Sequence, residues 1–190
     1  MKNKLPKVAI LFSGVGSNMA YILEHMHKRE VDVVVALTNN SEAGGVTIAK
    51  SARIPVEIVD PKTFLNREDF DHEVLRRLAL YAPDLAILAG FMRILTPIFT
   101  EQIHAINLHP SLLPRHKGLH AIEKSYADPY PEGGVTIHWV NAELDGGEII
   151  LQKKIGKNGF SFDDYEKEIK RIEKIALAEG IKKVLNSDVL

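Results

Sequence analysis

Short apolar runs alternate with amphipathic segments through the first half of the chain. The runs are rich in Val, Ile and Leu, as is typical of strands buried on both faces, and they cover 8–12, 31–37, 56–59, 85–89 and 106–109. Apolar positions spaced about 3.6 residues apart predict helices between them. These lie after Asn18 and over 44–53, 67–81 and 98–103. The alternation predicts βαβ units and a parallel sheet with helices on both faces.

The second half has a different pattern. Residues 135–140 and 149–155 are strand-like and are separated by a polar segment, which indicates a further, antiparallel edge of the sheet. Residues 162–185 form one long amphipathic pattern, with a capping motif at Ser161. We therefore expect one domain over 1–190: an open, mostly parallel Rossmann-like α/β sheet with an antiparallel edge and a long C-terminal helix. The inward stripe of this helix is Tyr165, Ile169, Ile172 and Ala176.

Composition narrows the class of protein. The 190 residues carry 24 basic and 25 acidic side chains, and this balance disfavours a nucleic-acid binder. No cysteine is present, which excludes disulfides and a thiol nucleophile. Every apolar run is shorter than the roughly 18 residues of a membrane span, and the lysine-rich start lacks a signal-peptide cleavage pattern. We expect a cytoplasmic protein that binds no membrane.

Four polar clusters follow predicted strands, where open α/β sheets bind ligands. They are Ser13–Asn18, Gly90–Leu95, Asn107–His109 and the loop at Asp145, and we expect them to converge on one crevice. In Ser13–Asn18, glycines before a helix N-terminus favour a phosphate or another anion. The alternative is a plain turn capped by Ser17 or Asn18. The segment lacks the third glycine of a dinucleotide fingerprint, which makes a dinucleotide-dependent oxidoreductase improbable.

Asn107 and His109 lie on one face of an extended segment. Two convergent donors can stabilise an oxyanion in acyl transfer. Asp145, before Gly146 and Gly147, can approach closely and raise the pKa of His109. The alternatives are a structural Asn and His and an ordinary Asp-Gly turn.

Histidines also raise the question of a metal. His116 and His120 have i, i+4 spacing, and His138 is a third possible ligand. Gly118 disfavours a helix between the first two, and no His-Glu-x-x-His motif is present. We expect no metal.

The motifs together resemble the folate-dependent phosphoribosylglycinamide formyltransferase family. The matching strings come in that family's order and spacing and cover nearly the whole chain: Ser13–Asn18, 82–95, 107–114, 118–120, 135–138 and 143–147. The family is similar to a wider group that includes methionyl-tRNA and sugar formyltransferases and formyltetrahydrofolate hydrolase. Within that group, the glycine turn and the lack of an extra domain favour a small ribonucleotide as acceptor.

The resemblance implies a reaction and a set of site residues. The enzyme would pass the formyl group of 10-formyltetrahydrofolate to the amine of glycinamide ribonucleotide in purine biosynthesis, through a tetrahedral oxyanion. Asn107, His109 and Asp145 would be catalytic, and Ser111 would not be a nucleophile. Ribonucleotide contacts would come from Gly16, Ser17, Asn18 and Glu173. The folate pocket would be lined by Met92, Arg93, Ile94, Leu95, Val140, Asn141, Glu143 and Leu144.

Some positions depart from the family. Val15 stands where Asn is frequent, Lys170 where glutamine is common, and 115–117 differs from some members. The alternatives are a formyltetrahydrofolate hydrolase, a formyltransferase acting on another amine such as a nucleotide sugar, and a non-catalytic folate- or nucleotide-binding module. We expect small-molecule substrates and a monomer or homodimer.

Overall fold

The computed structural model describes residues 4–187. The chain divides into two compact units, the first ending at Ile106 and the second beginning at Asn107. Among the described residues, seven strands follow the order β3-β2-β1-β4-β5-β6-β7 in the sheet. Strand β5 (Ala105–His109) starts in the first unit and ends in the second. The expectation that 1–190 is a single domain stays a prediction.

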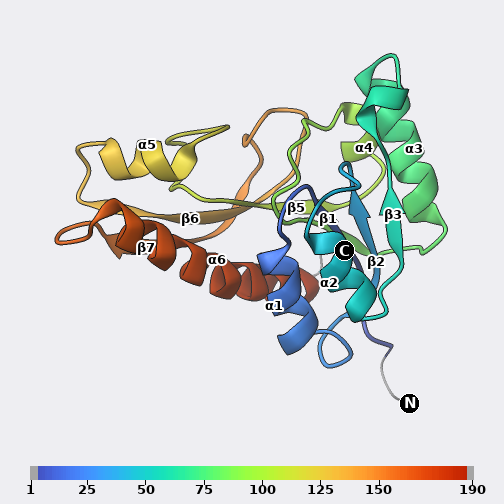
Figure 1. Cartoon of the computed structure of the whole chain (residues 1–190), viewed down its shortest axis with the longest axis horizontal. Coiled ribbons are helices and arrows are strands. Elements are labelled where there is room, and N and C mark those ends of the chain that lie inside the picture. Colours follow the sequence, from blue (N-terminus) through green and yellow to red (C-terminus); the bar gives the residue numbers. More distant parts are fainter. Residues whose placement is uncertain (1–3, 188–190) are drawn as a thin grey trace. The chain divides into compact units, whose positions relative to one another are not determined.

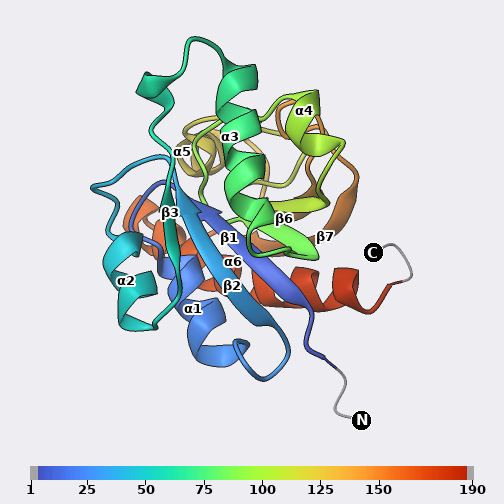
Figure 2. The same cartoon turned by 90° about the vertical axis from the view of Figure 1, so that its right-hand side faces the viewer.

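The first unit is a parallel sheet covered by helices, as predicted. Strand β1 pairs in parallel with β2 and β4, and β2 pairs in parallel with β3. Figure 1 shows α1 and α2 on one side of β1 and β2, and α3 on the other. Figure 2 shows β3, β2 and β1 side by side. The elements are β1 (Lys7–Phe12), α1 (Ser17–His25), β2 (Asp32–Thr38), α2 (Gly45–Ser51), β3 (Val56–Ile58), η1 (Pro61–Thr63), α3 (Arg67–Ala79), β4 (Leu85–Leu88) and α4 (Pro97–Thr100).

Burial on both faces explains the continuous apolar strands. Val8 to Phe12 of β1 have no exposed surface, and β4 is buried throughout. Helix α3 turns Phe70, Val74 and Leu78 inward, as its spacing predicts. Asp71 is also fully buried there, and its carboxylate accepts the backbone N–H and the hydroxyl of Thr96. That contact holds the chain at the start of α4.

The second unit contains the antiparallel edge. Strands β6 (Glu132–Trp139) and β7 (Ile149–Gly156) pair antiparallel, which confirms the prediction. Helix α6 (Phe162–Leu185) has the predicted bounds, and Figure 1 shows it running along β6 and β7. The Ser161 side chain caps α6 by accepting the N–H of Asp164, and all four residues of the predicted inward stripe are buried.

Helix α5 (Ala121–Ala127) and the short helix η1 are elements that the apolar pattern did not predict. The buried residues of α5 are only Ala121 and Ser125. Because these two do not form an apolar stripe, the hydrophobic pattern gave no sign of a helix here. Ser125 and Tyr165 of α6 share a hydrogen bond of 2.9 Å between their hydroxyls. In the described part of the chain, the helices are too short or too polar to span a bilayer.

Candidate active site

Asp145 is the centre of a buried polar cluster in the second unit. It lies in the loop between β6 and β7 with φ of 49°, a left-handed conformation that Asp tolerates better than most residues. Its side chain is only 7% exposed. The carboxylate accepts the backbone N–H of Gly118 at 2.8 Å and the Asn107 amide at 3.3 Å. Strand β5, the segment that follows it and the β6–β7 loop therefore meet at one carboxylate.

His109, at the end of β5, has an acceptor at each ring nitrogen. Its Nδ1 lies 3.3 Å from Asp145 Oδ2, and its Nε2 donates to the carbonyl oxygen of His116 at 2.8 Å. A neutral imidazole donates through one nitrogen only, whereas an imidazolium donates through both. Protonation of His109 therefore adds a hydrogen bond to this cluster. The predicted grouping of Asn107, His109 and Asp145 is present.

The pKa of His109 differs from the sequence expectation. Burial lowers this pKa, and its effect exceeds the opposing effects of Asp145 and of the His116 carbonyl. Asp145 does raise the pKa of His109, as expected, but burial outweighs this effect and the net shift is downward. Burial also acts to raise the pKa of Asp145, but the neighbouring His138 ring, the hydrogen bond from Gly118 and the charge of His109 hold it below its usual value.

His138, which the sequence analysis considered only as a possible metal ligand, is a further member of the cluster. It is 2% exposed, and its Nδ1 donates to the carbonyl oxygen of Trp139 at 2.8 Å. In the neutral ring, Nε2 then accepts from the Asn107 amide at 3.1 Å. The amide of Asn107 thus donates to both His138 and Asp145. Because side chains alternate along a strand, β6 puts His138 on the same face as the buried Thr136. This two-residue spacing was the sequence signal that could have placed His138 in the cluster.

Thr136 and Gln152 hold the segment that follows β5. The Thr136 hydroxyl donates to the carbonyl oxygen of Ser111 at 2.7 Å and accepts the N–H of Leu113 at 3.0 Å. Gln152 donates to the carbonyl oxygen of Leu113 at 2.9 Å. Ser111 is fully buried and its hydroxyl donates to the Arg115 carbonyl at 2.6 Å. No base contacts that hydroxyl among the interactions described, which agrees with a structural role.

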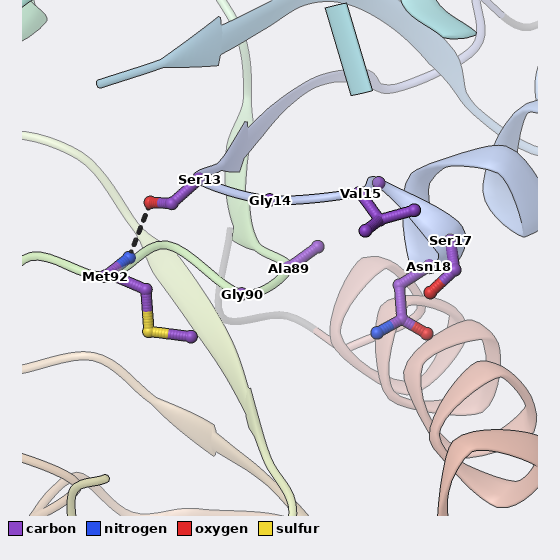
Figure 3. Close-up of a pocket in the computed structure, with 9 residues that line it drawn as sticks. Ser13, Gly14, Val15, Ser17, Asn18, Ala89, Gly90 and Met92 are labelled. Carbon is purple, nitrogen blue, oxygen red and sulfur yellow. Dashed lines mark hydrogen bonds between the residues drawn. The ribbon is translucent and has the colours of Figure 1, made fainter. Parts of the chain in front are cut away.

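The first unit contains the glycine turn for which the sequence predicts anion binding. A pocket of about 250 Å³ is lined by residues 13–18, Ala89, Gly90 and Met92. Figure 3 shows the Ser13 hydroxyl accepting the N–H of Met92, a contact of 2.7 Å that joins the two predicted clusters of this unit. Gly16, with φ of 81°, is the N-cap of α1 without a side-chain cap, so the alternative of capping by Ser17 or Asn18 is wrong.

The remaining predicted contacts lie in both units. In the first, Met92 and Ile94 are exposed, Leu95 is buried, and the guanidinium of Arg93 lies 5.2 Å from the centre of the Phe70 ring. In the second, Asn141, Glu143 and Leu144 are exposed, while Val140 and Glu173 of α6 are half-buried. Convergence of the four clusters on one crevice stays a prediction. Within residues 4–187, no three His, Asp or Glu side chains are grouped so as to bind a metal.

Comparison with known proteins identifies the family. The profile of the formyl transferase family matches residues 6–181. This chain belongs to the formyl transferase family. It is similar to the phosphoribosylglycinamide formyltransferase of Haemophilus influenzae, with 38% identity over 155 residues, which is 80% of this chain and 73% of that protein. The Escherichia coli enzyme of the same name is 37% identical over 78% of this chain and 72% of its own length.

The similarity to known proteins extends to a solved structure. The phosphoribosylglycinamide formyltransferase of Campylobacter jejuni has a TM-score of 0.94 and 43% identity, covering 96% of this chain and 99% of its own. The mostly parallel sheet with an antiparallel edge and a C-terminal helix is therefore the fold of this family.

Proposed function

We propose that this formyl transferase moves the formyl group of 10-formyltetrahydrofolate to the amine of glycinamide ribonucleotide, a step of purine biosynthesis. The observation that carries the proposal is the buried cluster in which one carboxylate, Asp145, contacts both Asn107 and His109. Two relatives and one solved structure with the name of that activity, similar over most of the chain, support the choice of acceptor.

The cluster suits attack on a formyl carbon. The amine attacks that carbon, and negative charge develops on the formyl oxygen. Asn107 and protonated His109 donate to this oxygen, and each such donor is typically worth about 3–4 kcal/mol of barrier. The new C–N bond remains, the bond to N10 breaks, and the amine proton passes to N10 through water held by Asp145. No covalent enzyme intermediate forms.

Substrate binding must redirect hydrogen bonds in this cluster. The Asn107 amide donates to His138 and Asp145, and His109 Nε2 donates to the His116 carbonyl. The formyl oxygen has to replace one acceptor of the Asn107 amide and to share the Nε2 proton of His109 with the His116 carbonyl, as a three-centre hydrogen bond. Groups that tighten only on the transition state stabilise it selectively, which is the requirement for a faster chemical step.

Substrate contacts follow the same proposal. The ribonucleotide phosphate binds the glycine turn at Gly16, Ser17 and Asn18, and Glu173 receives its amine end. The folate is held by 92–95 and by Val140, Asn141, Glu143 and Leu144. The folate is a co-substrate, and the reaction uses no metal. We place the enzyme in the cytoplasm as a monomer or homodimer.

The deciding experiment separates transfer from hydrolysis and from binding. Purified protein is mixed with 10-formyltetrahydrofolate, with and without glycinamide ribonucleotide, and both products are quantified by mass spectrometry. We expect tetrahydrofolate and formylated ribonucleotide in equal amounts, and only with acceptor present. Tetrahydrofolate release without acceptor would indicate a hydrolase, and binding without turnover would indicate a binding module.

A further inference from the structure

His116 connects the buried cluster to a second ion-paired group. Its backbone carbonyl accepts the Nε2 proton of His109 at 2.8 Å. Its own ring donates from Nε2 to Asp128 Oδ2 at 2.6 Å. One residue thus contacts the proposed catalytic histidine with its backbone and a carboxylate with its side chain.

Asp128 is a fixed anchor for that ring. Its side chain is 7% exposed and lies 2.6 Å from the Lys157 ammonium group, which is 9% exposed. Lys157 also donates to the carbonyl oxygens of Ser125 and Asp128. Arg115 approaches the same carboxylate at 3.4 Å. Because Asp128 has several buried partners, it cannot follow a movement of His116 at little cost.

The backbone of His116 needs such an anchor. Its φ of 56° is left-handed, a conformation that costs a residue with a Cβ roughly 1–2 kcal/mol. In the ordinary right-handed or extended regions, the peptide carbonyl would turn away from its present direction. The bond between the ring and Asp128 opposes that change.

We propose that His116 is a positioning residue for His109: Asp128 holds the His116 ring, and the carbonyl fixed in this way holds the Nε2 proton of His109. The inference rests on the proposed function, since it assigns His109 a catalytic role. It gives a role to a residue to which neither the sequence motifs nor the names of the relatives assign one. It concerns the segment 115–117, where the sequence departs from some family members.

The charged groups around the two rings determine the direction in which the pKa of His109 should change if the proposal is correct. His109 faces Asp145 and His138, while the His116 ring faces Asp128 with Arg115 and Lys157 behind it. The His116 carbonyl raises the pKa of His109, whereas a positive charge on the His116 ring lowers it. Loss of the ring alone would therefore raise the pKa of His109. Loss of the carbonyl contact, the larger of these two effects, would lower it.

The test uses His116→Asn. Asparagine tolerates the left-handed conformation, but its side chain is too short to make the imidazole's bond to Asp128. His120→Asn is the matched control, because His120 has φ of 60° and a ring that is 73% exposed. Two quantities are measured: kcat and KM against pH, and the pKa of His109 by NMR of its ring, assigned with His109→Asn.

We expect His116→Asn to lower kcat at neutral pH about tenfold, as loss of roughly one hydrogen bond to a charged group implies. KM should stay within about twofold of the parent, since binding contacts are not removed. The pKa of His109 should fall, and His120→Asn should match the parent. His116→Gln, which restores a donor with longer reach, should recover kcat.

Three results would overturn the proposal. One is a pKa of His109 that rises or stays the same in His116→Asn. Another is an unchanged kcat in that variant. The third is a His116→Gln variant that folds yet shows the same defect as His116→Asn. The pKa comparison needs no turnover, so it also separates failure of this inference from failure of the proposed formyl transfer. If His116→Asn does not fold, the comparison of His116→Gln with the parent decides.

Discussion

Replacing Asp145 by asparagine tests the buried cluster most directly. Asp145→Asn keeps the shape of the side chain and removes its charge. At the observed 3.3 Å from His109, attraction between the carboxylate and an imidazolium is about 5 kcal/mol at an effective dielectric constant of about 20. Desolvation offsets part of this, and mutational series give about 1.5–3 kcal/mol for hydrogen bonds to charged groups. A loss of about 1.5–3 kcal/mol corresponds to a kcat lower by about one to two orders of magnitude.

Stopped-flow and steady-state assays of formyl transfer between pH 5 and pH 9 measure this effect. In the parent, the rate falls as pH rises through the pKa of His109, which burial places below the ordinary histidine value. Asp145→Asn lowers that pKa further, so its rate should fall at a lower pH. Asp163→Asn, at an exposed position in the first turn of α6, is the control and should match the parent. A kcat of Asp145→Asn within about threefold of the parent would refute the reasoning.

Three further outcomes follow from the same structure. Gly16→Val should raise the ribonucleotide KM at least tenfold and leave the folate KM unchanged. The reason is that a Cβ at Gly16, where φ is 81°, would lie 2.7 Å from Gly45 Cα. Gly14→Ala is the control, because the space around a Cβ at Gly14 is open. Thr136→Val should lower the free energy of unfolding in urea by about 2–3 kcal/mol, since its fully buried hydroxyl serves three partners; a change below about 0.5 kcal/mol would contradict this. Lys157 holds the pKa of Asp128 below its ordinary value of 3.8 despite burial. The ion pair therefore stabilises the folded protein above pH 3.8, and this stabilisation is lost as pH falls below that value. The difference in free energy of unfolding between the parent and Asp128→Asn should shrink in that range.

The apolar pattern was sufficient for most elements because burial decides them locally. Strand β1 has no exposed residue from Val8 to Phe12, and α6 has its predicted bounds at Phe162 and Leu185. The pattern failed where partners are distant in sequence. Helix α5 has no apolar stripe and makes its inward contact through Ser125 and Tyr165.

The residues of the candidate site could be predicted from the sequence, but the net direction of the pKa shift of His109 could not. The spacing of Asn107 and His109 and the glycines after Asp145 indicated the cluster that the structure contains. The sequence could not show how deeply His109 is buried, and burial reverses the expected direction of its pKa shift. The backbone contact from His116 was also out of reach, because a left-handed turn at a histidine has no reliable sequence signal.

The left-handed backbone at Asp145 has a consequence for protein engineering. Asparagine shares this conformational tolerance with aspartate, whereas β-branched side chains adopt it rarely. A saturation library at this codon should therefore yield well-expressed, inactive asparagine clones beside poorly expressed valine, isoleucine and threonine clones. Expression yield and turnover would thus vary independently across a single randomised position.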